Sequence, residues 1–191
     1  REVVDMSRWV VDIPAGESGD YKIESNTTTS GEQSWLTYVE YKGLTGGPYT
    51  VLYRKYTGDG GENWINIMQD TEAEYKEHDW LMSRMSGDII IGGLGLGVVN
   101  VGLLAESNVT SVTIIEKEQD IIDLVWEHCD KDDRFTLIHA DVHEWEIPDG
   151  SSWDVGFFDT WLTHEESLSS YQTRINNKYG SFVTEISGWS W

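Results

Sequence analysis

The pattern of apolar and polar residues changes near residue 70. Before that point, short runs rich in aromatic and β-branched residues are separated by clusters of Gly, Ser, Asn and Pro, a pattern typical of antiparallel strands joined by turns. The runs that predict strands are residues 21–24, 35–41, 49–55 and 64–68. We therefore expect residues 1–69 to form a small antiparallel β annex.

After residue 70, apolar runs alternate with amphipathic segments. Thr71, followed three residues later by Glu74, predicts a capped helix start, and this helix is expected to run to about residue 85. The predicted buried strands are residues 88–91, 112–116, 135–139, 153–158 and 181–186, and the predicted helices between them are residues 98–105, 119–129 and 165–178. The alternation predicts a Rossmann-like α/β domain over residues 70–191, with an open, mostly parallel sheet of about five strands.

A glycine-rich turn joins the first predicted parallel strand to the next helix. Its glycines are Gly92, Gly93, Gly95 and Gly97. Such a turn brings backbone N–H groups and the positive end of a helix close to a ligand, although the same glycines also occur where elements simply pack tightly. The turn predicts a ligand site only together with other groups at the same edge of the sheet.

Acidic residues follow the next three predicted strands. Glu116 ends the second parallel strand, where a carboxylate can accept hydrogen bonds from ribose hydroxyls. Asp141 follows the third strand and Asp159 the fourth. Because the carboxyl ends of parallel strands meet at one edge of an open sheet, these acids and the glycine turn indicate a nucleoside site.

The turn does not fit two common nucleotide motifs. A dinucleotide fingerprint needs a third glycine where this chain has Val98 or Asn100, and no phosphate-binding G-x-x-x-x-G-K-[ST] segment exists. The remaining pattern is G-x-G-x-G, preceded by one more glycine.

With these motifs, the sequence resembles class I S-adenosylmethionine-dependent methyltransferases, and within them the spermidine-synthase-like branch, which includes uncharacterised members carried by bacteriophages. The matching segments are residues 68–78, 89–97, 112–117, 140–141 and 153–159, within a resemblance that covers residues 48–187. The resemblance implies S-adenosylmethionine as the cofactor. We expect a small-molecule substrate, with a protein acceptor as the alternative.

The resemblance also implies roles for individual residues. The donor-binding residues would be Gly92, Gly93, Gly95, Gly97, Glu116, Asp141 and Val142. Asp159 and Trp161 would be the catalytic residues facing the acceptor, and Gln69, Asp70 and His78 would bind substrate.

Three departures from the family pattern shape the functional expectation. Ile91 stands where many methyltransferases have an acid. Gly95 and Leu162 stand where aminopropyltransferases have two acids. Because both acids of aminopropyltransferases are missing, methyl transfer is the first expectation. Aminopropyl transfer, or a non-catalytic Rossmann-like module that binds a nucleoside or assembles with itself, remains an alternative. No sixth and seventh strand hairpin is evident, and the uncovered sheet edge favours a homo-oligomer.

Composition and charge exclude several other classes. The chain has 191 residues and 13 basic against 34 acidic residues, a net charge of −21, which argues against a nucleic-acid partner. No apolar run is long enough to cross a membrane, and the first residues lack the order of a signal peptide, so we expect no membrane partner and a cytoplasmic location.

A metal site has one sequence candidate. His139, Asp141 and His143 would share one side of an extended strand, and their side chains are common zinc or iron ligands. The strand is predicted to end near Ala140, however, so we expect no metal.

Overall fold

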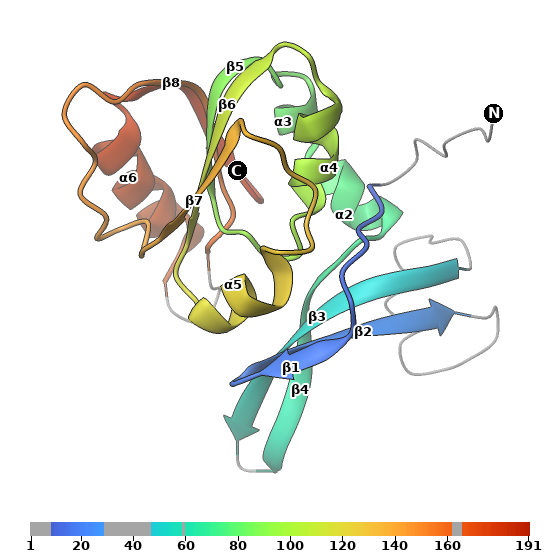
Figure 1. The fold of residues 1–191 in the computed structure, drawn as a ribbon. Helices are drawn as coiled ribbons and strands as arrows, with labels where there is room; N and C mark the ends of the chain where they lie inside the picture. The colour runs from blue at the N-terminus through green and yellow to red at the C-terminus, as the bar shows by residue number, and fades with distance from the viewer. Residues whose placement is uncertain (1–8, 29–46, 59, 162–165) are drawn as a thin grey trace, which may run out of the picture. The chain divides into compact units, whose positions relative to one another are not determined.

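A computed structural model describes residues 9–28, 47–58, 60–161 and 166–191 (Figure 1). The chain divides into two compact units, each of which is described by itself. Unit 1 comprises Arg1–Lys76, Gly95–Val101 and Asp120–Asp130, and unit 2 comprises Glu77–Leu94, Gly102–Gln119 and Lys131–Trp191.

Unit 1 contains the predicted antiparallel sheet. Its strands are β1 (Gly16–Ser18), β2 (Tyr21–Thr28), β3 (Gly47–Gly58) and β4 (Gly61–Gln69), in the order β1-β2-β3-β4. The predicted strands at 21–24, 49–55 and 64–68 are confirmed, whereas the one at 35–41 lies outside the described residues. The short strand β1 was not predicted because Gly-Glu-Ser carries no apolar signal. The predicted boundary after residue 69 coincides with the end of β4 and stays a prediction.

Unit 2 contains a five-stranded parallel sheet, as predicted. Its strands are β5 (Gly87–Gly92), β6 (Val109–Glu116), β7 (Phe135–His139), β8 (Trp153–Phe158) and β9 (Val183–Gly188). The spatial order is β7-β6-β5-β8-β9, so the chain builds outward from β5 in one direction and then returns to add β8 and β9 on the other side (Figure 1). The sheet is therefore a Rossmann-like open sheet with a topological switch point between β5 and β8.

The helices differ from the prediction mainly at their ends. Their bounds are α2 Glu72–Glu77, α3 Asp79–Met82, α4 Val98–Ala105, α5 Gln119–Val125 and α6 Leu168–Tyr179. The predicted cap is present, because the Glu74 N–H donates to Thr71 Oγ1 at 3.4 Å. The predicted helix at 119–129 is too long: α5 ends at Val125, and a turn follows in which the Cys129 N–H donates to the Val125 carbonyl.

The prediction of one continuous helix from 71 to 85 is wrong. His78 has φ −100° and ψ 10°, outside the helical region, and it separates α2 from α3. The His78 carbonyl accepts a hydrogen bond from the Met82 N–H, and the buried imidazole packs against Phe157 with ring centroids 5.4 Å apart. The periodic sequence pattern predicts a helix there, but it contains no signal for this tertiary contact.

Helix α6 completes the core of unit 2. Ser167 caps it by accepting the Ser170 N–H, and Tyr171, Ile175 and Tyr179 recur at four-residue intervals on its buried face. These three side chains pack with residues of the sheet in one cluster. The cluster fixes the strands whose ends carry the candidate site.

Within the described part of the chain, no helix is long and apolar enough to span a bilayer.

Candidate functional site

The carboxyl ends of β5 and β8 meet at the switch point of the unit 2 sheet. The Asp159 N–H donates to the Gly92 carbonyl at 2.9 Å, and the Gly93 N–H donates to the Ile115 carbonyl at 2.8 Å. Open α/β sheets bind ligands just outside this edge, at the switch point. The backbone therefore brings three predicted site residues, Gly92, Gly93 and Asp159, to the expected place.

Gly93 leaves the backbone bare where the chain turns out of β5. Its φ is +98°, which disfavours any residue with a side chain. A Cβ at this position would lie 3.0 Å from the Asp159 carbonyl oxygen and 3.3 Å from Thr160 Cγ2. Only glycine fits here without displacing the first residues after β8.

The Glu116 carboxylate turns toward the glycine turn. Glu116 is 7% exposed, and its Oε2 accepts the Leu94 N–H at 2.8 Å while its Oε1 accepts the Glu118 N–H at 2.8 Å. Burial raises the pKa of Glu116, and these two N–H donors partly oppose the rise. A carboxylate offers about four acceptor positions, so Glu116 can still receive hydroxyl donors.

Asp141 and Val142 follow β7 at the same edge of the sheet. Asp141 Oδ1 accepts the His143 N–H at 2.8 Å, and Lys117 Nζ lies 3.4 Å from Oδ2. Partial burial raises the pKa of Asp141. The hydrogen bond from the His143 N–H and the positive charge of Lys117 lower it by more, so the pKa lies below its ordinary value. Val142 packs in the core, and its carbonyl accepts the Tyr179 hydroxyl at 2.7 Å. Asp141 is thus an ionised acceptor at the end of β7.

Asp159 is the strongly perturbed acid of this edge. Burial raises its pKa from an ordinary 3.8 to about 7, and the negative charge of Glu77 adds to the rise. The Tyr171 hydroxyl lies 2.8 Å from Thr160 Oγ1. Burial is the main cause that raises the pKa of Tyr171 to about 12, and the negative charge of Asp159 adds to this rise. At neutral pH, Asp159 is therefore divided between its protonated and ionised forms.

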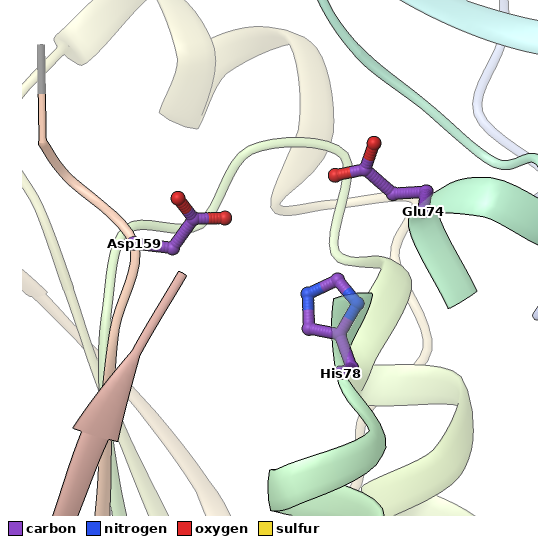
Figure 2. A group of neighbouring side chains, drawn as sticks. All are labelled: Glu74, His78 and Asp159. Atoms are coloured by element: carbon purple, nitrogen blue, oxygen red, sulfur yellow. The ribbon is translucent and has the colours of Figure 1, made fainter. Parts of the chain in front are cut away.

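His78 lies beside Asp159 in unit 2. A ring nitrogen of His78 and a carboxylate oxygen of Asp159 are within 4.8 Å of each other, and Figure 2 shows Asp159 at the end of its strand with the imidazole nearby. Figure 2 also draws Glu74, which precedes His78 by four residues and belongs to unit 1. Within unit 2, His78 and Asp159 each offer one atom that could bind a metal ion, and the expectation of no metal stays a prediction.

Trp161 packs against Trp189, which in turn binds Glu77, and the sequence pattern marks neither Trp189 nor Glu77 as a site residue. Its ring centroid is 5.6 Å from that of Trp189, and its Nε1–H donates to the Glu166 carbonyl at 3.0 Å. The Trp189 Nε1–H in turn donates to Glu77 Oε2 at 2.8 Å. Glu77 and Trp189 are 112 residues apart in the sequence, so no local pattern could have predicted this contact.

The second half of the glycine turn belongs to unit 1. Gly95 and Gly97 have φ values of +52° and +67°. A Cβ at Gly97 would lie 2.8 Å from the Cβ of Cys129, and the side chain of Met68 occupies the corresponding space beside Gly95. Residues of the chain itself thus contact this half of the turn.

Asn100, on the first turn of α4, carries an unsatisfied acceptor. Its N–H donates to the Gly97 carbonyl at 3.1 Å, and its Oδ1 is buried without a hydrogen-bond partner among the described residues. Buried polar atoms normally have a partner, so this oxygen fits a bound donor group or water.

Gln69 and Asp70 have partners within unit 1. Asp70 is 1% exposed and accepts the N–H groups of Val11 at 3.1 Å and Thr50 at 2.8 Å. Gln69 is 2% exposed and accepts the Asn66 side-chain amide at 2.8 Å. These contacts explain the burial of both residues, and their role in binding substrate stays a prediction.

The sequence candidate for a metal site does not form an extended row. His139 Nε2 lies 3.0 Å from the Lys117 carbonyl, and a turn over residues 142–144 follows Asp141. The ring of His143 packs edge-on against Tyr171. As expected, the strand ends before Asp141.

Comparisons with known proteins give fold likenesses. No family model and no curated protein matches the sequence. Solved structures similar to this chain include a candidate methyltransferase from Escherichia coli (TM-score 0.46, 12% identity, 59% of this chain and 65% of that one). A second is a candidate RNA methyltransferase from Pyrococcus horikoshii (TM-score 0.46, 17% identity, 59% of this chain and 58% of that one). A third is the N-methyltransferase NodS from Bradyrhizobium japonicum (TM-score 0.43, 14% identity, 56% of this chain and 61% of that one). The match thus spans less than two thirds of the length of each of these proteins.

Proposed function

We propose that this chain is an S-adenosylmethionine-dependent methyltransferase that acts on a small acceptor. The observation that carries the proposal is the placement of Glu116 at the end of β6, with its carboxylate directed to the Leu94 N–H of the glycine turn. An acid in this place can hold a ribose while the turn receives the rest of a nucleoside.

The residues of this edge fit such a donor. Gly93 keeps the turn bare, and a Cβ there would fill the space against Asp159 and Thr160. Glu116 would accept the ribose hydroxyls, and the ionised Asp141 would accept an adenine amine. S-adenosylmethionine, when bound, supplies a methyl carbon that is already activated by a positive sulfur. The chain then needs mainly to align an acceptor, because positioning supplies a large part of the rate in such a displacement.

Asp159 is the group best suited to handle the acceptor's proton. A general base works best when its pKa lies near the working pH, and the pKa of Asp159 is about 7. In its ionised form Asp159 would take the proton from an acceptor hydroxyl or amine, with His78 and Trp161 lining the same side. We propose these roles for Asp159, His78 and Trp161 together.

Two alternatives remain. Aminopropyl transfer would use the same nucleoside edge with a different donor. A non-catalytic module is favoured by the hydrogen bonds that Glu116 and Asp141 already accept from this chain, and by the contact between Met68 and the glycine turn.

Thermal unfolding with S-adenosylmethionine, S-adenosylhomocysteine and methylthioadenosine tests the proposal. A ligand at a hundred times its dissociation constant stabilises a protein by about 2.7 kcal/mol. We expect stabilisation of this size, seen as a higher unfolding temperature, with S-adenosylmethionine and S-adenosylhomocysteine. Transfer of label from methyl-labelled donor into an acceptor pool would then establish methyl transfer. No thermal shift with any of the three compounds would exclude a donor site, and a shift without transfer would favour the binding module.

A further inference from the structure

Met68 reaches the glycine turn because of an irregularity in β4. Asn66 pairs with Tyr53 of β3, whereas Met68 pairs with the next residue, Leu52, so Ile67 is an extra residue in the ladder. Side chains alternate between the faces of a strand, and one inserted residue reverses which of them share a face. The bulge therefore puts Met68, in place of Ile67, on the face of the fully buried Leu52 and leaves Ile67 46% exposed.

The sulfur of Met68 forms a hydrogen bond to the turn. Met68 Sδ accepts the Leu96 N–H at 3.1 Å, and all of the residues concerned belong to unit 1. A Cβ added to Gly95 would collide with this sulfur and would lie 3.1 Å from Met68 Cε. The absence of a side chain at Gly95 is thus what lets Met68 occupy the turn.

A thioether is a poor partner for this donor. Thioether sulfur is a weak acceptor, whereas a carboxylate forms charge-assisted hydrogen bonds that are about twice as strong as neutral ones. A ligand carboxylate therefore forms a stronger hydrogen bond with the Leu96 N–H than the Met68 thioether does. A ligand without a carboxylate has no such advantage.

We propose that Met68 is an internal placeholder on the glycine turn, which ligands bearing a carboxylate displace and ligands lacking one leave in place. The proposal rests on the proposed function, since the carboxylate would be that of an amino acid joined to adenosine. It makes Met68 a specificity-determining residue, because only a ligand with a carboxylate has to displace the thioether, so Met68 reduces the affinity that the carboxylate adds.

Calorimetric titration of two ligands separates this role from simple blocking. S-adenosylhomocysteine carries the carboxylate, whereas methylthioadenosine does not. In Met68→Ala no thioether has to leave, so we expect S-adenosylhomocysteine to bind about three- to tenfold tighter, the range for one net hydrogen bond, while methylthioadenosine changes less than about twofold. Met68→Leu keeps the bulk but not the acceptor and should show the same preference to a smaller extent. The half-buried Met82, replaced by Leu, provides the control for a methionine away from the turn.

A spectroscopic readout in the unaltered protein does not depend on the folding of any variant. The chain has four methionines, so selective methyl labelling gives four resonances, and Met68→Leu assigns one of them. Saturation with S-adenosylhomocysteine should change the chemical shift of the Met68 methyl group. Saturation with methylthioadenosine should leave this chemical shift close to its value in the ligand-free protein. If S-adenosylhomocysteine binds while the Met68 resonance stays fixed and the affinity ratio is equal in all variants, the placeholder is refuted and the proposed function stands. If neither ligand binds to any of these proteins, both are refuted.

Discussion

Replacing Asp159 by Asn should change how the stability of this protein depends on pH. In the folded protein the pKa of Asp159 is about 7, compared with an ordinary 3.8, so the folded state holds a proton that the unfolded chain releases between these values. The free energy of unfolding falls with rising pH wherever the folded state binds more protons. The contribution of this proton is therefore complete below pH 3.8 and is lost as the pH rises through about 7.

The magnitude follows from the width of that interval. The gap between 3.8 and about 7 corresponds to at most about 4 kcal/mol, at about 1.4 kcal/mol for each tenfold change in proton affinity. The side chain of Asp159 is only partly buried, so water still reaches the carboxyl group and reduces the cost of ionising it. We therefore expect a stability change of about 2 kcal/mol. The asparagine side chain of the variant cannot titrate. The free energy of unfolding of Asp159→Asn minus that of the wild type should therefore rise by this amount between about pH 4.5 and pH 8.5.

Urea unfolding of the two proteins at several pH values measures this difference. Glu77, His78 and Tyr171 face Asp159 and are present in both proteins, so the two proteins differ only in the Asp159 carboxyl group. Glu77→Gln should move the midpoint of the change to lower pH, because it removes the second cause of the raised pKa of Asp159. Asp133→Asn, on an exposed loop, controls for removing one negative charge from a chain of net charge −21. Parallel pH curves for wild type and Asp159→Asn would refute the reasoning.

Three further substitutions test other parts of the structure. Gly93→Ala should destabilise the protein by about 1–3 kcal/mol, because its φ of +98° and the contact with the Asp159 carbonyl oppose a Cβ; thermal unfolding at wild-type stability would contradict this. Tyr179→Phe removes the buried hydrogen bond to the Val142 carbonyl and should cost about 1–3 kcal/mol in urea unfolding, whereas an unchanged midpoint would show that this bond contributes nothing. Ser167→Ala removes the cap of α6 and should cost about 1 kcal/mol. Ser170→Ala, at an exposed position that keeps the capped N–H, is the matched control, and equal effects of the two changes would argue against the cap.

The parallel sheet could be predicted because its signals are local. Ile89, Ile90 and Ile91 form a continuous apolar run, and all three are buried. The glycines after this strand and Glu116 after the next one mark strand ends, and in a parallel sheet such ends must meet at one edge. The fold class and the position of the candidate site therefore follow from patterns only a few residues long.

Other features depend on contacts that the sequence does not encode locally. The break at His78 reflects packing against Phe157, a residue far away in the chain. Met68 meets Leu96 across 28 residues, and only after a bulge has reversed its face of the strand. The pKa of Asp159 depends on burial and on Glu77, 82 positions earlier in the chain, which no motif indicates.

Calorimetric titration of S-adenosylhomocysteine into the wild type and into Glu116→Gln tests most directly whether this edge of the sheet binds an adenosyl donor. Hydrogen bonds to a charged group contribute about 1.5–3 kcal/mol, so the wild type should bind and Glu116→Gln should bind at least tenfold more weakly. Glu118→Gln, which removes a nearby acid while keeping the N–H that Glu116 accepts, should bind like the wild type. Equal affinity of the wild type and Glu116→Gln, with both proteins folded, would contradict the assignment of the donor site.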